Sequence, residues 1–367
     1  MTDTRLKELA EYGFDDVEIS QLRNALFEIA KQTLEHYDEI CEEDLRSLGQ
    51  LTELRHELRK HSPLAETNVM KLYSYIDELL DSIKDHGTPQ FTRQARCAFM
   101  ARSFCRTLVE KGYFTKQEMD DFMLSIPTVA SEFERDFDLY SHGKLSRDDF
   151  NHLYGHLRLG TYDIRSDSYR NIYFDVASAN LTGNNKVKQE AKSLDLERLQ
   201  VALDEAGIPV TPEKFIEFIK KATQNREYFK FEFTKSLSLM LDVIVKLGEV
   251  MAIAREDMSY LEIQDLLSYH SRDSYIQTIE TRRRFYHVNS YLVLPEVIFD
   301  VGDIDVIDID EARPNFITNK VVEAPIVNLD EDHDSDITGK IVVLTKADPG
   351  YDWIFAKDIA GFVTKYG

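Results

Sequence analysis

Cysteine is scarce in this sequence, which has only Cys41, Cys97 and Cys105 among its 367 residues. The three form neither a C-x-x-C pair nor an even-numbered set, a pattern that argues against a disulfide framework and favours buried thiols in a reducing compartment. The chain also lacks an uninterrupted apolar run of about 18 residues, and its first residues have neither the basic nor the apolar region of a signal peptide. We therefore predict a cytoplasmic protein that does not enter a membrane.

Glycine and proline are also few, at 15 and nine residues. Apolar residues make up 43% of the chain and charged residues 30%. This composition excludes a collagen-like repeat and does not fit a disordered chain, which would have fewer apolar residues. The length exceeds that of one average domain and is sufficient to bury a sizeable core.

Positive charge is in short supply, because 44 lysines and arginines face 66 aspartates and glutamates, a formal net charge of −22. A broad surface for nucleic acid or for anionic lipid is therefore excluded, although a local basic patch for phosphate is not. The P-loop, the dinucleotide-binding glycine motif, the H-E-x-x-H zinc motif and the G-x-S-x-G serine motif are all absent. No catalytic residue is assigned from these motifs.

Two acidic stretches resemble metal sites at first sight. In "DEDHDSDITG", alternate aspartates occupy positions typical of a calcium loop, but Ile337 stands where the loop needs glycine and Val343 where it needs glutamate. In "DVGDIDVIDID", aspartates alternate with aliphatic residues, as in an exposed strand or linker. We expect solvated connectors and no metal site. The aspartates concerned are Asp332, Asp334 and Asp336 in the first stretch, and Asp303, Asp305 and Asp308 in the second.

Helical patterns dominate residues 1 to about 290. Apolar residues recur at helical spacing over about 20–60, which predicts one long helix or two joined near Gly49. Residues 226–251 are apolar on more than one face and predict a central buried helix. Three helix starts are predicted from capping patterns. They are Thr115 with Glu118, Ser259 with Glu262, and Thr211 followed by Pro212.

The pattern changes after Tyr291, where β-branched residues are punctuated by prolines. We predict a domain boundary between about 290 and 315. Further on, "KIVVLT" and "GFVT" are strand candidates, and residues 351–358 between them favour a helix, which gives a β-α-β succession.

One non-periodic segment, "YGHLRLGTYDIRSDSY", concentrates polar, aromatic and flexible residues after a predicted helix. Such a segment can fill a cleft with hydrogen-bond donors, a titratable imidazole and a guanidinium that suits phosphate. The alternative is that its tyrosines and histidine are hydrogen-bonded polar residues of the core. The candidate site residues here are Tyr154, His156, Arg158, Thr161, Tyr162 and Asp163.

Arginines are concentrated in two further places. The helix predicted after "HGTP" carries four of them, and its Arg96 and Arg106 flank an apolar stripe, so they either point into a site or form structural ion pairs. The run "TRRRFYH" at 281–287 suits either phosphate binding or an ion-paired helix face, because consecutive arginines point to different sides of a helix.

The stretch "DPGYDWIF" followed by "IAGFVTKYG" resembles the start of the phosphohistidine swivelling domain in the phosphoenolpyruvate synthase and pyruvate phosphate dikinase family. The segments "GTPQFTRQARCAFMARSFCRTLVEKG", "YGHLRLGTYDI" and "REYFKFEFTKSLSLMLDVI" look like the helical central region of that family. Leu159 departs from the pattern, because proline is expected there. In the family, the similar stretch continues through Gly-Gly-x-x-Ser-His, whose histidine carries the phosphoryl group.

The resemblance implies a phosphotransferase that moves phosphate from ATP to histidine and from histidine to an acceptor. It implies a mainly α fold with three parts: a helical acceptor-binding domain at 1–295, a linker with short strands at 296–336, and the first half of a β/α swivelling domain at 337–367. The acceptor would contact His156 and Arg158, with Tyr154, Thr161, Tyr162 and Asp163 shaping the loop and Arg96 helping to hold phosphate.

On this resemblance we expect the ATP-grasp domain and the phosphorylated histidine to lie outside the chain, so the isolated chain would be inactive. ATP and Mg²⁺ are implied only for the complete enzyme, and we assign no catalytic residue, metal or cofactor to this chain. The expected partners are a small-molecule phosphoryl acceptor and a separate component that carries the ATP-grasp domain and the phosphohistidine. The alternative is a non-catalytic helical binding or scaffold protein derived from the same family.

Overall fold

The described part of the chain is mainly helical, as predicted, and includes a small parallel sheet of three strands near the C-terminal end of the sequence. The computed structural model describes residues 6, 8–160, 162–171, 193–289, 298, 300–304, 316, 318, 320–330, 335–346 and 349–366. The α-helices are α2 (Asp16–Glu35), α3 (Tyr37–Lys60), α4 (Val69–His86), α5 (Thr88–Glu110), α6 (Lys116–Leu124), α7 (Val129–Ser141), α8 (Arg147–Tyr154), α9 (Leu196–Ala206), α10 (Pro212–Val250), α11 (Arg255–Met258) and α12 (Arg272–Asn289).

Shorter elements complete the described chain. The 3-10 helices are η1 (Leu9–Tyr12), η2 (Pro63–Ala65), η4 (Ile263–Leu266), η5 (Val301–Ile304) and η6 (Pro349–Ala356). The strands are β1 (Ile326–Asn328), β2 (Ile341–Lys346) and β3 (Gly361–Tyr366).

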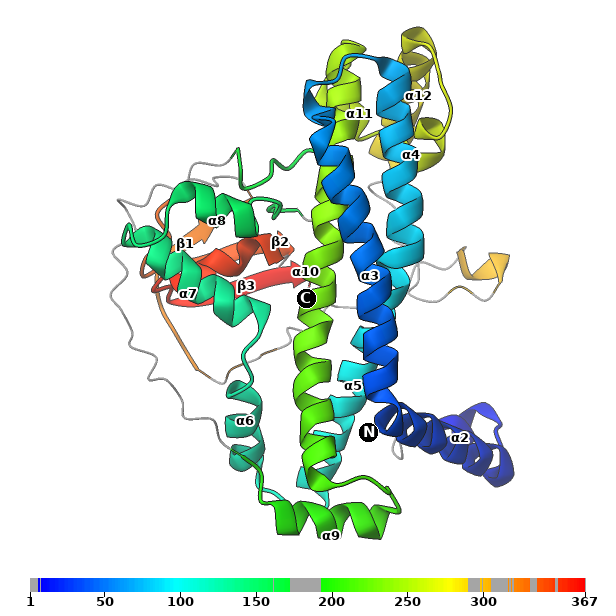
Figure 1. Ribbon diagram of the computed structural model, residues 1–367, viewed down its shortest axis with the longest axis vertical. Coiled ribbons are helices and arrows are strands. Elements are labelled where there is room, and N and C mark those ends of the chain that lie inside the picture. Colours follow the sequence, from blue (N-terminus) through cyan, green and yellow to red (C-terminus); the bar gives the residue numbers. More distant parts are fainter. Residues whose placement is uncertain are drawn as a thin grey trace. The chain divides into compact units, whose positions relative to one another are not determined.

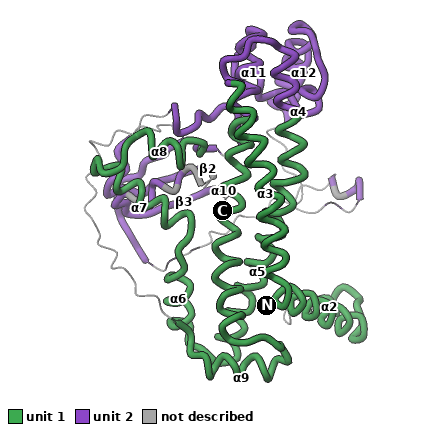
Figure 2. The backbone as a smooth tube through the Cα atoms, in the orientation of Figure 1, with its two compact units in different colours: residues 1–61, 78–157, 174–239 green, residues 62–77, 158–173, 240–367 purple. Residues whose placement is uncertain are grey.

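The chain forms two compact units, each assembled from three stretches of sequence (Figure 2). Unit 1 contains residues 1–61, 78–157 and 174–239, and unit 2 contains residues 62–77, 158–173 and 240–367. The three-part division inferred from the sequence stays a prediction.

Unit 1 is built around α3, α5 and the first part of α10, which run alongside one another (Figure 1). The junction between α4 and α5 depends on Gly87, because a Cβ there would lie 2.9 Å from the Ile83 carbonyl oxygen and 3.2 Å from Leu51 Cδ2. Only glycine fits so close an approach. Gly87 therefore lets α5 start directly after α4 while the junction lies close to Leu51 of α3.

A buried polar network connects the helices of unit 1. The Tyr37 hydroxyl donates to Gln94 Oε1 at 2.8 Å, and Gln94 Nε2 donates to Asp44 Oδ2 at 2.7 Å. Arg93 pairs with Asp44 at 3.0 Å. Buried polar groups are costly unless they are paired, so this network fixes the register of α5 against α3. One of the four arginines noted on this helix, Arg93, is thus a structural ion-pair partner.

Unit 2 contains the parallel sheet, in the order β1-β2-β3. Ile341 of β2 pairs with Ile326 of β1 and with Gly361 of β3. The strands predicted at "KIVVLT" and "GFVT" are confirmed, and the helix expected between them is the 3-10 helix η6. The core of the sheet consists of Val327, Leu329, Ile337, Val342, Leu344, Tyr351 and Ile354, with Leu159 packed against it.

Helix positions partly follow the predictions. The central buried helix is confirmed inside α10, where Phe229, Phe233 and Leu247 are buried. The residues at 20–60 form two helices, as one of the two predicted alternatives had it. These helices meet at His36 and not near Gly49. Gly49 continues the helix because buried Leu48 and Leu51 on either side anchor α3.

Capping patterns were correct in two of three cases. Thr115 and Glu118 form the predicted capping box of α6, and α10 begins at Pro212. The third start was wrong, because Ser259 lies at the end of α11. Glu262 instead precedes η4, where its backbone N–H donates to Asp265 Oδ2 at 2.7 Å.

Candidate functional site

The candidate segment starts at the end of α8 in unit 1. The Tyr154 hydroxyl donates to Asp136 Oδ2 of α7 at 2.9 Å, and both side chains are buried. Burial and the hydrogen bond to Asp136 raise the pKa of Tyr154 well above its ordinary value, so the phenol stays neutral. This hydroxyl is a hydrogen-bond donor that holds α8 on α7.

The structure brings His156 and Tyr154 together on one aromatic side chain. The ring of Phe231 on α10 lies 4.6 Å from the His156 ring and 5.8 Å from the Tyr154 ring, with both contacts edge to face. Tyr154 also contacts Phe133 and Phe150, at 5.0 and 5.1 Å. An imidazole packed this way has a fixed orientation, which both a core residue and a catalytic base require.

Arg158 belongs to unit 2 and is 1% exposed. Its Nη1 donates to the Ser166 carbonyl oxygen at 2.6 Å, and its Nη2 pairs with Asp242 in the last part of α10. Residues 158 and 168 also form an isolated antiparallel bridge. The guanidinium therefore ties the candidate segment to α10 within unit 2.

The remaining candidates of this segment lie nearer the surface. Asp163 pairs with Arg165 at 2.7 Å, and the Ser166 backbone N–H donates to the Asp163 carbonyl oxygen at 3.2 Å. Tyr162 is exposed. Thr161 lies outside the described residues. Arg158 and Asp163 are thus brought together through Ser166.

Just beyond the segment, Asp167 pairs with Arg255 of α11. Burial of Asp167 opposes its ionisation, but hydrogen bonds from Arg255 and Asn171 outweigh this, and its pKa lies below the ordinary value. The carboxylate is therefore charged and holds a second guanidinium in unit 2.

Arg96 is exposed on α5 and makes no hydrogen bond or ion pair with any residue in the described ranges. The apolar stripe predicted beside Arg96 includes Phe99 and Leu108. It is not a continuous buried face, because Phe99 is exposed and Leu108 is buried.

In the basic run at 281–287, the ion-paired interpretation is confirmed for two of the three arginines. Arg282 pairs with Asp265, and Arg283 pairs with Asp257.

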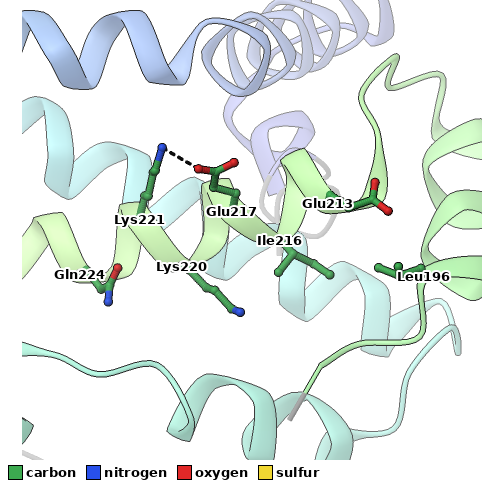
Figure 3. A pocket seen from close by; sticks show the side chains of 7 residues that line it. All are labelled: Leu196, Glu213, Ile216, Glu217, Lys220, Lys221 and Gln224. Carbon is green, nitrogen blue, oxygen red and sulfur yellow. Dashed lines mark ion pairs between the residues drawn. The ribbon is translucent and has the colours of Figure 1, made fainter. Parts of the chain in front are cut away.

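A depression of about 420 Å³ lies along α10 near the start of α9. Figure 3 shows Lys220 and Lys221 of α10 pointing to different sides, with Glu217 paired to Lys221 at 2.7 Å. Lys221 also pairs with Asp38 of α3 at 2.8 Å. These residues were not predicted from the sequence, because a lysine pair in a long helix is typical of a solvated face.

Neither metal ligands nor membrane spans were found in the part of the chain that the structure describes. That part contains no group of three histidine, cysteine or carboxylate side chains suited to a metal ion. Asp332, Asp334, Asp305 and Asp308 lie outside it, as does the side chain of Asp303. Among the described helices, none is both long and apolar enough to cross a bilayer.

Comparison with known proteins gives no relative for this chain. No family model, no curated protein and no solved structure matches it.

Proposed function

We propose that this chain is the acceptor-binding part of a cytoplasmic phosphohistidine-dependent phosphotransferase of the phosphoenolpyruvate synthase and dikinase type. One observation carries the proposal. Leu159, from a segment that resembles the helical central region of such an enzyme, packs in unit 2 against a core that includes Tyr351 and Ile354, from the segment "DPGYDWIF" that resembles its swivelling domain. Leu159, the departure from the expected proline, is the residue that makes this contact.

In the proposed reaction, an oxygen of the acceptor attacks phosphorus while the bond from phosphorus to the histidine nitrogen breaks. The acceptor proton must leave, and a fixed imidazole suits its removal near neutral pH. His156 has such a fixed ring against Phe231. Arg158 would hold the loop in place, because its terminal nitrogens already bind Ser166 and Asp242.

ATP and Mg²⁺ chemistry belongs to a separate component in this proposal. The assignment rests on the resemblance alone, in which the ATP-grasp domain and the phosphohistidine lie outside the stretches that this chain matches. The component that supplies the phosphoryl group would carry the ATP-grasp domain and the phosphohistidine.

The proposal is tested with a separately made histidine component, phosphorylated with labelled phosphate and mixed with this chain. We expect the label to leave the histidine only when the chain and an acceptor are both present, with pyruvate, sugars and hydroxyl-bearing antibiotics as the acceptor panel. His156→Gln should slow the transfer at least about 100-fold, because general acid–base catalysis contributes that much. His152→Gln, an exposed histidine one turn earlier on α8, is the matched control.

If no acceptor in the panel takes up the label, the proposed function is contradicted. If His156→Gln transfers the label as fast as wild type, the assignment of His156 is wrong.

The second candidate function is that of a helical binding or scaffold protein. It is favoured by the internal partners of Tyr154 and Arg158, since Asp136 and Asp242 already bind the groups that an acceptor would need. It predicts binding of the histidine component without loss of label.

A further inference from the structure

A cavity of about 640 Å³ lies between α5, α6 and α10 in unit 1. This volume is within the range of small-molecule sites. Four cationic side chains line it: Arg102 and Arg106 from α5, Lys116 from the first turn of α6, and Arg226 from α10. Three helices thus direct positive charge at one space in a chain whose net charge is −22.

These cations are not held in ion pairs, although carboxylates line the same cavity. Across the described ranges, none of the four makes an ion pair or a hydrogen bond, and Arg226 only stacks over Phe99 at 5.1 Å. By contrast, Arg93 and Arg198 each have a carboxylate within 3 Å. Because guanidinium groups bind phosphate through paired N–H donors, unpaired arginines around one cavity form a suitable anion site.

The cavity also has hydrogen-bond acceptors. Glu110, Asp120 and Glu227 line it, and Glu227 Oε2 accepts from the Ala130 backbone N–H at 3.3 Å. Carboxylates repel a simple anion but accept hydrogen bonds from hydroxyl groups. The mixture of cations and carboxylates therefore suits a ligand that carries a phosphate at one end and hydroxyl groups at the other.

The apolar part of the lining restricts the class of ligand further. It contains Ala98, Cys105, Met119 and Met123, and Cys105 Sγ donates to Met123 Sδ at 3.9 Å. Burial raises the pKa of Cys105 to about 12, so the thiol adds no competing negative charge. No aromatic side chain is among the described residues of the lining, which leaves no platform for a nucleobase.

We propose that this cavity binds a sugar phosphate. Arg102, Arg106 and Arg226 contact the phosphate, while Asp120 accepts hydrogen bonds from the sugar hydroxyls. The C–H face of the sugar lies on Met119 and Met123. The site lies wholly in unit 1 and does not depend on the proposed phosphotransferase activity.

The test is calorimetric titration of the full chain with glucose 6-phosphate. We expect saturable binding that weakens with added salt, and weaker or no binding of glucose, inorganic phosphate and AMP. Arg106→Gln and Arg226→Gln should each lower the affinity about 10- to 100-fold, the value of one charge-assisted hydrogen bond. Arg46→Gln, an exposed arginine of α3 in the same unit, should leave it unchanged, and thermal unfolding checks that each variant is folded.

Several outcomes would overturn the inference. If glucose 6-phosphate shows no saturable binding, the proposed site does not exist. If Arg46→Gln and Arg106→Gln lower the affinity equally, the binding is non-specific electrostatic attraction. Inorganic phosphate that binds as tightly as glucose 6-phosphate rules out the sugar contacts. Tighter binding of AMP would show that the ligand is a nucleotide and not a sugar phosphate.

Discussion

Arg158 and Arg106 carry the same guanidinium group in opposite surroundings. Arg158 is 1% exposed and held by Ser166 and Asp242, whereas Arg106 is exposed at a cavity and binds no described residue. A buried charge must be paired by the protein itself, so it is committed to structure. An unpaired charge at a cavity keeps its hydrogen bonds for a ligand. Residue type alone, as read in the sequence, therefore does not separate a buried, ion-paired arginine from one that lines a cavity without a charge partner.

The strongest test of this contrast is Arg158→Met. It should lower the free energy of unfolding by about 3–5 kcal/mol, because it leaves the largely buried carboxylate of Asp242 without its charge partner. Urea denaturation measures the change. The control is Arg165→Met in the same segment, where the pair with Asp163 is half exposed and its loss should cost under about 1 kcal/mol. Equal effects of the two variants would refute the structural role of Arg158.

The next largest effect concerns the buried hydroxyl group of Tyr154. Tyr154→Phe should destabilise unit 1 by about 1.5–3 kcal/mol, because Asp136 loses a buried hydrogen-bond donor. Tyr140→Phe is the matched control, since Tyr140 stacks on Phe150 at 4.8 Å and its hydroxyl binds no residue that the structure describes. It should change stability by less than about 0.5 kcal/mol. Hydrogen exchange of α7 and α8 amides would locate the effect, and unchanged exchange in Tyr154→Phe would contradict it.

A smaller effect depends on pH. Hydrogen bonds from Arg198 and from Thr115 lower the pKa of Glu118 to about 2, compared with about 4.3 in an unfolded chain. The resulting stabilisation is complete above pH 4.3 and is lost as the pH falls towards 2. The Glu118→Gln variant should therefore lose less stability than the wild type between about pH 5 and pH 2, as measured by the urea midpoint at each pH.

The partner of Glu118 supplies the control for that experiment. Arg198→Gln removes the guanidinium that Glu118 binds at 2.8 Å, so it should flatten the same part of the profile. Adding Glu118→Gln to Arg198→Gln should then have less effect than in the wild type. A full effect in both backgrounds would show that Arg198 does not act on Glu118.

The smallest effect is expected at the cavity. Without ligand, Arg106→Gln should change the free energy of unfolding by less than about 0.5 kcal/mol, because no described residue loses a partner. Thermal unfolding measures this, with Arg158→Met as the opposite extreme. A loss comparable to that of Arg158→Met would place Arg106 among the structural arginines.

The sequence predicts elements well where the cause is local. Thr115 caps α6 because its hydroxyl reaches the backbone three residues ahead, and the β-branched run at 341–346 forms a strand. Ser259 carried the same signal, but the chain ended α11 there instead of starting a helix. The break at His36 carries no glycine or proline, so no local pattern marked it.

The sites were less predictable because they depend on residues distant in sequence. The partners of Tyr154 and Arg158 come from α7 and from the last part of α10, and no spacing pattern links them. The cavity combines Arg106 with Arg226, which are 120 positions apart. The sequence singled out Arg106 on its helix but could not show that Arg226 faces the same space. Whether a charge is paired is a property of the fold.

The way in which α4 and α10 are shared affects how the protein can be divided. The chain passes between the two units five times, after residues 61, 77, 157, 173 and 239, and two of these passages lie inside continuous helices. A truncation at any single position therefore removes part of both units or leaves one incomplete. Neither unit corresponds to a single continuous stretch of sequence. We expect unfolding of one unit to destabilise the other, because α4 and α10 each contain residues of both units.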